Sequence, residues 1–187
     1  LQIQCEVSGE TYIDKERITS FLNDLTYPLY FLDFETIGLA VPIYDQSKPY
    51  QQLVFQYSLH VQEKPIGPLE HFEYLAIADP NIDPRKGFVE QLIKECGTSG
   101  DVIVYNIGFE RSKLEDAVLQ FPEYAVQLQN IISRLKDLMI PFQQKWYYTP
   151  DMKGSYSIKY VLPALVPELS YQDLEIQEGG TASLTFS

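Results

Sequence analysis

The sequence predicts an α/β domain in which a mixed sheet is flanked by helices. Three apolar segments of strand length come first along the chain, with turn residues between them, and helical patterns follow. A short, wholly apolar strand then lies between two of the helices. Strands joined by turns pair antiparallel and a strand reached through a helix pairs parallel, so the predicted sheet combines both. The chain has 187 residues, which suffices for one such domain with its own core.

The first half of the chain contains one predicted helix and three predicted strands. Asp14 to Leu25 is amphipathic and forms a helical lead-in over residues 1–26, which Pro28 separates from the sheet. A long connection covers Ile37 to Gln51. The predicted strands are Leu29–Phe34, Leu53–Val61 and Leu69–Leu75.

The second half is mainly helical. Asp83 is suited to cap a helix that begins at Pro84 and ends at Gly97. A short buried strand and its following helix come next. The remaining predicted elements are strand Asp101–Tyr105, helices Asn106–Gln120 and Glu123–Leu138, irregular segment Pro141–Lys153 and helix Ser155–Val166.

Composition limits the classes of function. The formal charge of −12 opposes tight, autonomous binding of a phosphate backbone, although a metal ion could neutralise a local site. No run approaches about 18 apolar residues, so no membrane span is expected. Cys5 and Cys96 match no disulfide or zinc pattern, which predicts free thiols and a cytoplasmic location.

The segment Tyr30–Thr36 carries the strongest functional signal. A hydrophobic run ends in Asp33-Phe34-Glu35, and side chains two residues apart in a strand share one face. Two convergent carboxylates at the end of a buried strand are unfavourable unless a cation lies between them. Mg²⁺ or Mn²⁺ prefers such oxygen ligands. The alternative is a strand end whose acids point to solvent.

A second signal follows the buried strand at Asp101–Tyr105. Asn106 stands where that strand turns into a helix, and Glu110 lies four residues later on the same helix face. A capping box places the acid three residues after the cap, so this spacing fits a capping box poorly. An acid that only stabilises the helix dipole is the alternative.

These motifs resemble those of a known superfamily. A strand with Asp-x-Glu, followed by a buried strand and Asn-x-x-x-acid, resembles the RNase H-like DEDD exonucleases, which include the DnaQ-like proofreading domains. The segments Tyr27–Thr36, Phe55–His60 and Gly154–Lys159 resemble an uncharacterised bacterial branch, domain of unknown function 2779. That branch is often found behind a RecB-like nuclease domain in the same polypeptide.

The resemblance implies one RNase H-like domain over residues 1–187 that hydrolyses single-stranded DNA or RNA in the 3′-to-5′ direction. Asp33 would bridge two Mg²⁺ or Mn²⁺ ions, Glu35 would hold one, and Glu110 would help to place the other. The ions would lie roughly 3.5–4 Å apart. Glu110 departs from the family's usual Asp by one methylene. Thr36, Asn106 and Lys159 are expected to contact the substrate.

The superfamily also needs a fourth acid, usually in a late motif with Tyr or His. Both histidines, His60 and His71, precede Glu110, so no late His–Asp pair is possible in this chain. Asp151 matches Tyr-x-x-x-Asp but follows Pro150, and Asp137 is a weak candidate. We expect the fourth acid beyond Ser187, which predicts a C-terminally truncated and inactive fragment.

Two other functions remain open. The first is a degenerate nuclease fold that acts as a scaffold or nucleic-acid-binding module, which the acidic charge and Glu110 favour. The second is a haloacid-dehalogenase-like phosphatase with Asp33 as nucleophile. That family also needs a later Lys and a paired-acid motif, and the paired-acid motif is not found in the sequence.

Overall fold

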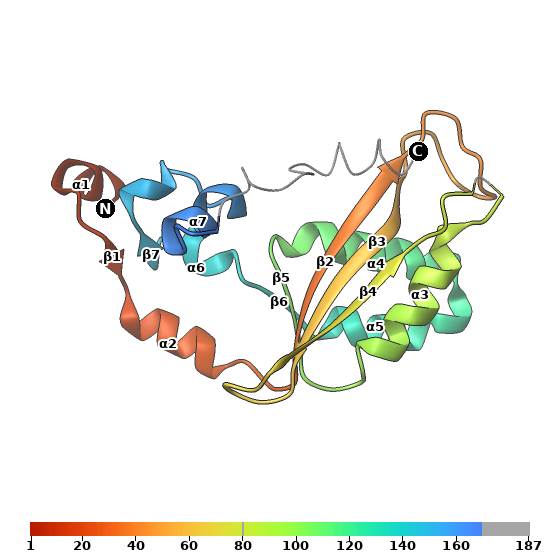
Figure 1. Ribbon diagram of the computed structural model, residues 1–187, viewed down its shortest axis with the longest axis horizontal. Helices are drawn as coiled ribbons and strands as arrows, with labels where there is room; N and C mark the ends of the chain where they lie inside the picture. The colour runs from red at the N-terminus through yellow and green to blue at the C-terminus, as the bar shows by residue number, and fades with distance from the viewer. Residues whose placement is uncertain (80, 170–187) are drawn as a thin grey trace. The chain divides into compact units, whose positions relative to one another are not determined.

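A computed structural model of the protein describes residues 1–79 and 81–169 (Figure 1). Contacts between Cα atoms divide the chain into two compact units. Among the described residues, one unit comprises 1–25 with 137–169, and the other comprises 26–136. Each unit has a hydrophobic core of its own. The single domain predicted over residues 1–187 stays a prediction.

The unit formed by residues 26–136 is built on a mixed five-stranded sheet with the order β4-β3-β2-β5-β6. Strand β2 pairs antiparallel with β3, β3 pairs antiparallel with β4, and β2 pairs parallel with β5. The α/β class and the mixed sheet are therefore as the sequence predicts. The strands are β2 (Leu29–Gly38), β3 (Gln52–Gln62), β4 (Leu69–Leu75), β5 (Asp101–Val104) and β6 (Leu135–Asp137).

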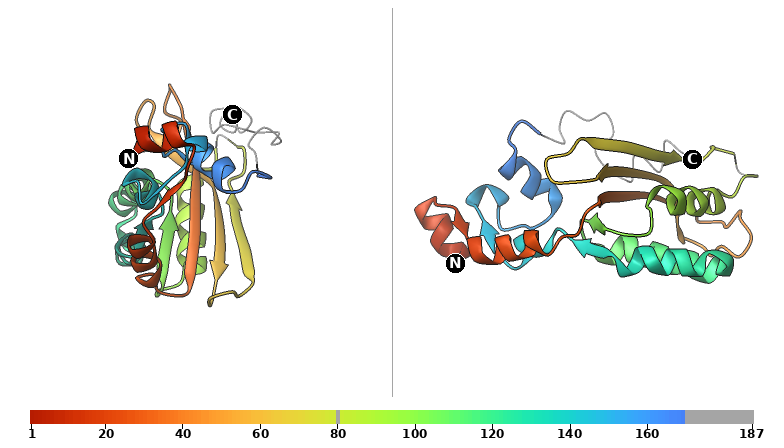
Figure 2. Two further views of the ribbon diagram at one scale, coloured as in Figure 1. Left: turned by 90° about the vertical axis from the view of Figure 1, so that its left-hand side faces the viewer. Right: turned by 90° about the horizontal axis from the view of Figure 1, so that it is seen from below.

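Helices cover one face of this sheet, as Figure 2 shows. They are α3 (Pro84–Glu95), α4 (Ile107–Gln120), the 3₁₀ turn η1 (Pro122–Tyr124) and α5 (Ala125–Ser133). The predicted cap of α3 is confirmed, because the Asp83 carboxylate accepts a hydrogen bond of 3.0 Å from the backbone N–H of Arg85. Phe88 and Leu92 of α3 enter the core beneath the sheet.

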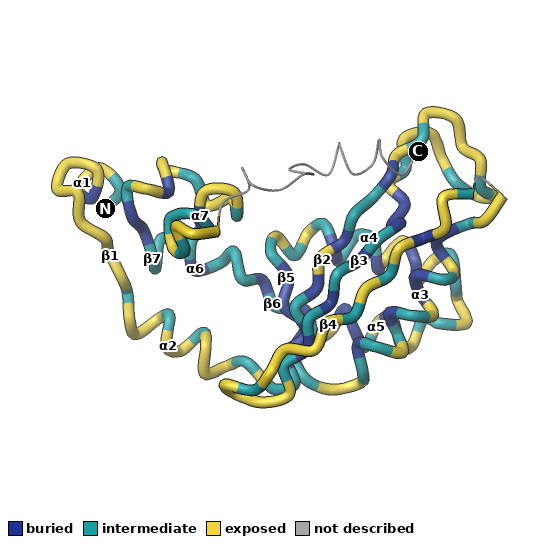
Figure 3. The backbone as a smooth tube through the Cα atoms, viewed as in Figure 1, coloured by how far each residue is buried: buried dark blue, intermediate teal, exposed yellow. Residues whose placement is uncertain are grey.

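Strand alternation decides which residues of β2 face these helices. Tyr30, Leu32 and Phe34 are buried in the main core, and the ring of Phe34 meets that of Phe88 edge-on with centroids 5.2 Å apart. Residues 31, 33 and 35 therefore point to the opposite face. Burial along the chain, drawn in Figure 3, is complete over β5 and low along the outer strand β4.

Two predicted boundaries are wrong in this unit. Strand β2 continues to Gly38 instead of ending at Phe34, so Asp33 and Glu35 lie inside the strand. The helix predicted over Glu123–Leu138 ends at Ser133, and Leu135–Asp137 form strand β6. The backbone N–H of Val102 donates to the carbonyl of Arg134 at 2.9 Å, so pairing with β5 outweighs the local helical pattern there.

The unit formed by residues 1–25 and 137–169 contains short elements around a small core of Cys5, Tyr148, Met152 and Val161. Asp14 caps α2 by accepting a hydrogen bond of 3.1 Å from the backbone N–H of Arg17. The segment predicted as irregular, Pro141–Lys153, holds a helical turn and a two-residue strand, and the first 13 residues add elements that were not predicted. The elements are α1 (Gln2–Ser8), β1 (Tyr12–Ile13), α2 (Lys15–Asn23), α6 (Ile140–Gln143), β7 (Tyr147–Tyr148), η2 (Pro150–Met152) and α7 (Ile158–Leu165).

Strand β1 pairs antiparallel with β7, which joins the two sequence segments of this unit. A pair of two-residue strands carries almost no local signal, because its hydrogen bonds depend on residues more than 130 positions apart. Both cysteines are buried free thiols, in agreement with the sequence prediction.

Candidate functional site

Asp33 and Glu35 lie on the face of the sheet opposite to helices α3, α4 and α5. Asp33 is exposed and Glu35 is half-buried, whereas their neighbours Leu32 and Phe34 are in the core. The structure thus brings the two carboxylates to one face, as predicted, but in mid-strand. Both residues are paired with β3, Asp33 with Ser58 and Glu35 with Gln56, which fixes the direction of their side chains.

The electrostatics of this pair are unfavourable for two anions. Desolvation raises the pKa of the Asp33 carboxyl group above its usual value, although the side chain reaches solvent. Desolvation also raises the pKa of Glu35, and the negative charge of Asp33 raises it further. The negative charge of Asp33 thus disfavours ionisation of Glu35. A cation between them would remove this repulsion.

A β-bulge follows the pair directly. The register of β2 against β3 shifts between Glu35, which pairs with Gln56, and Thr36, which pairs with Val54. Bulges increase the local twist and change the direction of the side chains that follow. Thr36, predicted to contact substrate, is half-buried just beyond this irregularity.

Asn106 stands between β5 and α4, as the sequence predicts. Its φ of 73° is in the left-handed region, which Asn adopts more readily than most residues. It occupies the N-cap position of α4, and its side chain makes no capping hydrogen bond to that helix. The parallel pairing of β2 with β5 ends at Phe31 and Ile103, two residues before Asp33.

Glu110 is buried in the first turn of α4, with 2% of its surface exposed. It shares its helix face with Leu114 and Ala117, which belong to the core beneath the sheet. Asp33 and Glu35 belong to the other face. Within residues 1–79 and 81–169, no three His, Cys, Asp or Glu side chains are grouped so that they could hold a metal ion. The predicted three-acid cluster is therefore not formed among these residues.

The other candidate residues are Lys159, Asp137 and Asp151, and each belongs to a different secondary-structure element. Lys159 is an exposed residue of α7, in the other compact unit. Asp137 ends β6 instead of following a helix, and its carboxylate accepts from the N–H of Met139 at 2.9 Å. Asp151 is exposed in the 3₁₀ turn η2. The segment around Gly179–Ser183 lies outside the described residues.

Sequence reasoning missed a polar row beside Asp33. Ser58 of β3 pairs with Asp33 on one side and with Glu73 of β4 on the other. The Oγ atom of Ser58 lies 3.2 Å from Nε2 of His71, and the rings of His71 and His60 stack with centroids 4.3 Å apart. Alternation alone predicts which strand face each residue occupies, but the register that aligns them is a tertiary property.

The sequence matches the family described as "Domain of unknown function (DUF2779)" over residues 30–157. It is 31% identical over 167 residues to the uncharacterized protein "MG366 homolog" of Mycoplasma pneumoniae, covering 81% of this chain and 25% of that protein. It is 28% identical over 172 residues to the uncharacterized protein UU173 of Ureaplasma parvum, covering 80% of this chain and 24% of that protein.

The chain thus spans about a quarter of the length of the curated relatives that it matches. None of the helices in the described part of the chain is both long enough and apolar enough to cross a membrane. The predicted cytoplasmic location stays a prediction.

Proposed function

The chain belongs to the family described as Domain of unknown function (DUF2779), and on that premise we propose that it is the catalytic part of a metal-dependent nuclease with an RNase H-like fold. One observation carries the proposal. Asp33 and Glu35 share a sheet face, both have raised pKa values, and the charge of one raises the pKa of the other. Two neighbouring carboxylates repel each other when no cation is present, and their oxygen atoms are the ligands that a hard divalent cation prefers.

Asp33 and Glu35 would hold a Mg²⁺ or Mn²⁺ ion, and Glu110 would help to place a second. Such ions, when bound, activate water and stabilise the leaving oxygen of a phosphodiester. Thr36, Asn106 and Lys159 would orient the strand of DNA or RNA through its sugar-phosphate backbone. The fit is partial, because the two carboxylates of β2 suit such an ion while Glu110 lies on the core-facing side of α4.

The sheet supports this proposal over the phosphatase alternative. Three consecutive antiparallel strands, β2, β3 and β4, are joined by a parallel strand β5 on the other side of β2. The RNase H-like resemblance predicts such a mixed sheet, whereas early antiparallel strands fit a haloacid-dehalogenase-like phosphatase badly. The RNase H-like assignment itself is part of the proposal.

The activity is proposed for the whole protein, because the chain covers only a quarter of its relatives. Single-stranded DNA or RNA is the proposed substrate, attacked from the 3′ end. A RecB-like nuclease domain in the same polypeptide is a proposed partner, on the same resemblance.

Metal binding by the 187-residue chain tests whether Asp33 and Glu35 hold a divalent cation. Titration with Mn²⁺, followed by electron paramagnetic resonance, should give saturable binding, and Asp33→Asn should weaken it tenfold or more, about 1.4 kcal/mol. Glu115→Gln is the matched control, since Glu115 is an exposed residue of α4. Equal Mn²⁺ affinity in wild type and Asp33→Asn would exclude the metal site.

A second candidate function is a degenerate nuclease fold that binds nucleic acid or acts as a scaffold. The position of Glu110 on the core-facing stripe of α4 and the formal charge of −12 favour it. Full-length protein incubated with labelled single-stranded DNA and RNA in Mg²⁺ or Mn²⁺ separates the two. Degradation that Asp33→Asn abolishes supports the nuclease; no degradation by wild type under either metal supports the scaffold.

A further inference from the structure

The chain has two histidines, His60 and His71, and both lie on the sheet face opposite to helices α3, α4 and α5. His60 belongs to β3, where its neighbour Leu59 points into the core beneath the helices. His71 of β4 is the direct partner of His60 across the two strands. The two imidazole rings stack with their centroids 4.3 Å apart and their planes 19° apart. The sheet face that carries Asp33 therefore also carries an aromatic stack.

The ring of His71 is held in one orientation by two neighbours. Its Nε2 atom lies 3.2 Å from Oγ of Ser58, within hydrogen-bond distance, and one of its faces is covered by the ring of His60. His71 is exposed on the outer strand β4, whereas His60 is half-buried. An aromatic ring that its neighbours already hold in place loses little conformational entropy when a further ring stacks on it.

The stack lies close to the proposed metal site. Ser58 is the direct partner of Asp33 across β2 and β3, and its hydroxyl group contacts His71. Asp33 and His71 are two strands apart, which corresponds to about 10 Å in a sheet. One strand of DNA carries a phosphate roughly every 3.4 Å along a duplex. A few nucleotides of a single strand therefore suffice to reach from the metal site to the stack.

The charges beside the stack favour a neutral ring over a phosphate as its ligand. Asp33 and Glu73 are paired with Ser58 from the two neighbouring strands, so a carboxylate residue lies on each side of the hydroxyl group. Both repel a phosphate when no metal ion is bound. A nucleobase carries no net charge, and every base has a π-face that can stack on an aromatic side chain. A phosphate of the same strand would be attracted by a cation at Asp33 and Glu35.

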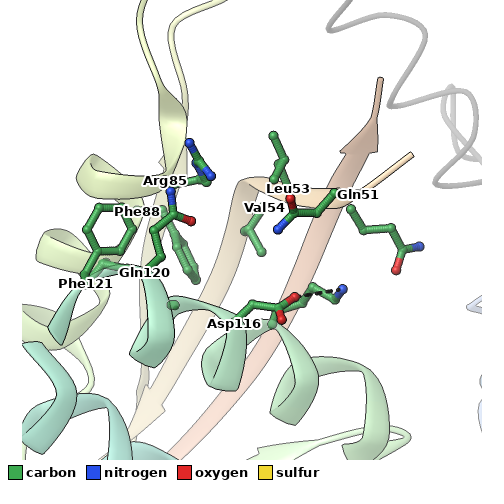
Figure 4. A pocket seen from close by; sticks show the side chains of 12 residues that line it. Gln51, Leu53, Val54, Arg85, Phe88, Asp116, Gln120 and Phe121 are labelled. Atoms are coloured by element: carbon green, nitrogen blue, oxygen red, sulfur yellow. Dashed lines mark ion pairs between the residues drawn. The ribbon is translucent and has the colours of Figure 1, made fainter. Parts of the chain in front are cut away.

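The pocket beside Arg85 is too small to receive a base. It lies between the start of β3 and helices α3 and α4, is lined by Arg85, Phe88 and Gln120 among others (Figure 4), and has a cavity volume of about 30 Å³. Such a space holds one water molecule. A water would satisfy the buried Nη1 atom of Arg85, which has no hydrogen-bond partner among the described residues. An exposed ring such as that of His71 meets no such limit of volume.

We propose that a base of single-stranded DNA or RNA stacks on the exposed face of the His71 ring, which is supported by the ring of His60 and oriented by Ser58. The inference rests on the proposed nuclease function, which supplies the strand and the cation that binds its phosphate. His71 is thereby a residue that positions the substrate. Because a stacking ring contacts the face of a base and not its edge, this contact selects single strands over duplexes without selecting one base.

The fluorescence anisotropy of a labelled single-stranded oligonucleotide, titrated with the 187-residue chain in Ca²⁺, tests the proposal, since Ca²⁺ prefers oxygen ligands as Mg²⁺ does. His71→Ala should weaken binding about tenfold, the effect of one lost base stack. His71→Phe should bind nearly as well as wild type, because it keeps an aromatic face. Leu119→Ala is the control, since Leu119 is an exposed apolar residue of α4. A duplex of the same sequence should bind more weakly, because its bases stack on one another.

Three results would overturn the proposal. Wild type fails to bind the single strand, or His71→Ala binds it as tightly as Leu119→Ala does, or His71→Phe loses as much affinity as His71→Ala. The last result would assign the contact to the charge or the hydrogen bonds of the imidazole. Circular dichroism checks that each variant is folded.

Titration with Mn²⁺ separates a failure of this inference from a failure of the proposed function. If Mn²⁺ binding depends on Asp33 while His71→Ala keeps its affinity for the strand, the stack is excluded and the nuclease proposal stands. If His71→Ala loses affinity for the strand but wild type binds no Mn²⁺, the stack stands and the nuclease proposal fails.

Discussion

The negative charge of Asp33 raises the pKa of Glu35, two residues along the same strand. Such coupling is a consequence of β2 continuing to Gly38, because an extended backbone holds both side chains on one face. Leu32 and Phe34 alternate with the two acids and pack into the core on the other side. The packing that stabilises the strand therefore also holds the two carboxylates together.

The first prediction concerns the pH dependence of stability. Because the folded state raises the pKa of Asp33, ionisation of this group destabilises the fold as pH rises through the folded pKa. Asp33→Asn should therefore raise the free energy of unfolding at pH 7 without metal. The gain should be small, since Asp33 reaches solvent, and should shrink as pH falls through about 4, where the carboxyl group becomes protonated in the unfolded state as well.

Urea denaturation followed by circular dichroism at pH 7 and pH 3.5 measures this effect. Glu115→Gln, an exposed change of the same kind on α4, serves as the control. A lower free energy of unfolding for Asp33→Asn at pH 7 would show that the carboxylate stabilises the metal-free fold.

The second prediction concerns Arg134, which joins α5 to the loop between α3 and β5. Its guanidinium donates to the carbonyls of Cys96, Gly97, Ser99 and Gly100 at 3.0–3.1 Å. Arg134→Lys should lower the free energy of unfolding by about 2 kcal/mol, because one ammonium group cannot reproduce this planar set of donors. Chemical denaturation measures the free energy of unfolding of this variant. Arg111→Lys is the control, and an equally small loss in both variants would contradict the prediction.

The third prediction concerns Gly100, just before β5. Its φ is +84°, and a Cβ atom there would lie 2.1 Å from the carbonyl oxygen of Pro28. Gly100→Ala should lower the free energy of unfolding by about 3 kcal/mol or more, since backbone must move. Gly108→Ala, in the first turn of α4, has only the Asn106 side chain within 4 Å at 3.9 Å and should be neutral or slightly stabilising. Equal melting temperatures for the two variants would disprove this account.

The fourth prediction concerns the reactivity of Cys96. Burial raises the pKa of its thiol to about 11, although the nearby Arg134 guanidinium opposes this shift. Because the thiolate is the reactive form, iodoacetamide at pH 8 should modify Cys96 about 100-fold more slowly than an ordinary thiol. Mass spectrometry of the peptide that contains Cys96, before and after denaturation, checks this. Rapid labelling in the native protein would contradict the burial of Cys96.

Local sequence patterns predict most of the helices and strands in the unit formed by residues 26–136. Asp83 and Pro84 predict the start of α3, and the apolar runs around Leu32 and Leu59 predict their strands, because capping and alternation depend on near neighbours. Strand β6 was missed because three residues that continue a helical pattern become a strand only through their pairing with β5. The same holds for β1 and β7, whose partners are distant in the chain.

For the candidate site, the sequence by itself determined that Asp33 and Glu35 share a face, because that follows from the two-residue period of any strand. Tertiary structure alone decided that Glu110 joins the core-facing stripe of α4 and that Ser58 and His71 lie beside Asp33. It also decided that Arg85 lines a pocket with an unsatisfied Nη1 among the described residues. Register, helix orientation and burial depend on contacts between distant segments, and no local period encodes them.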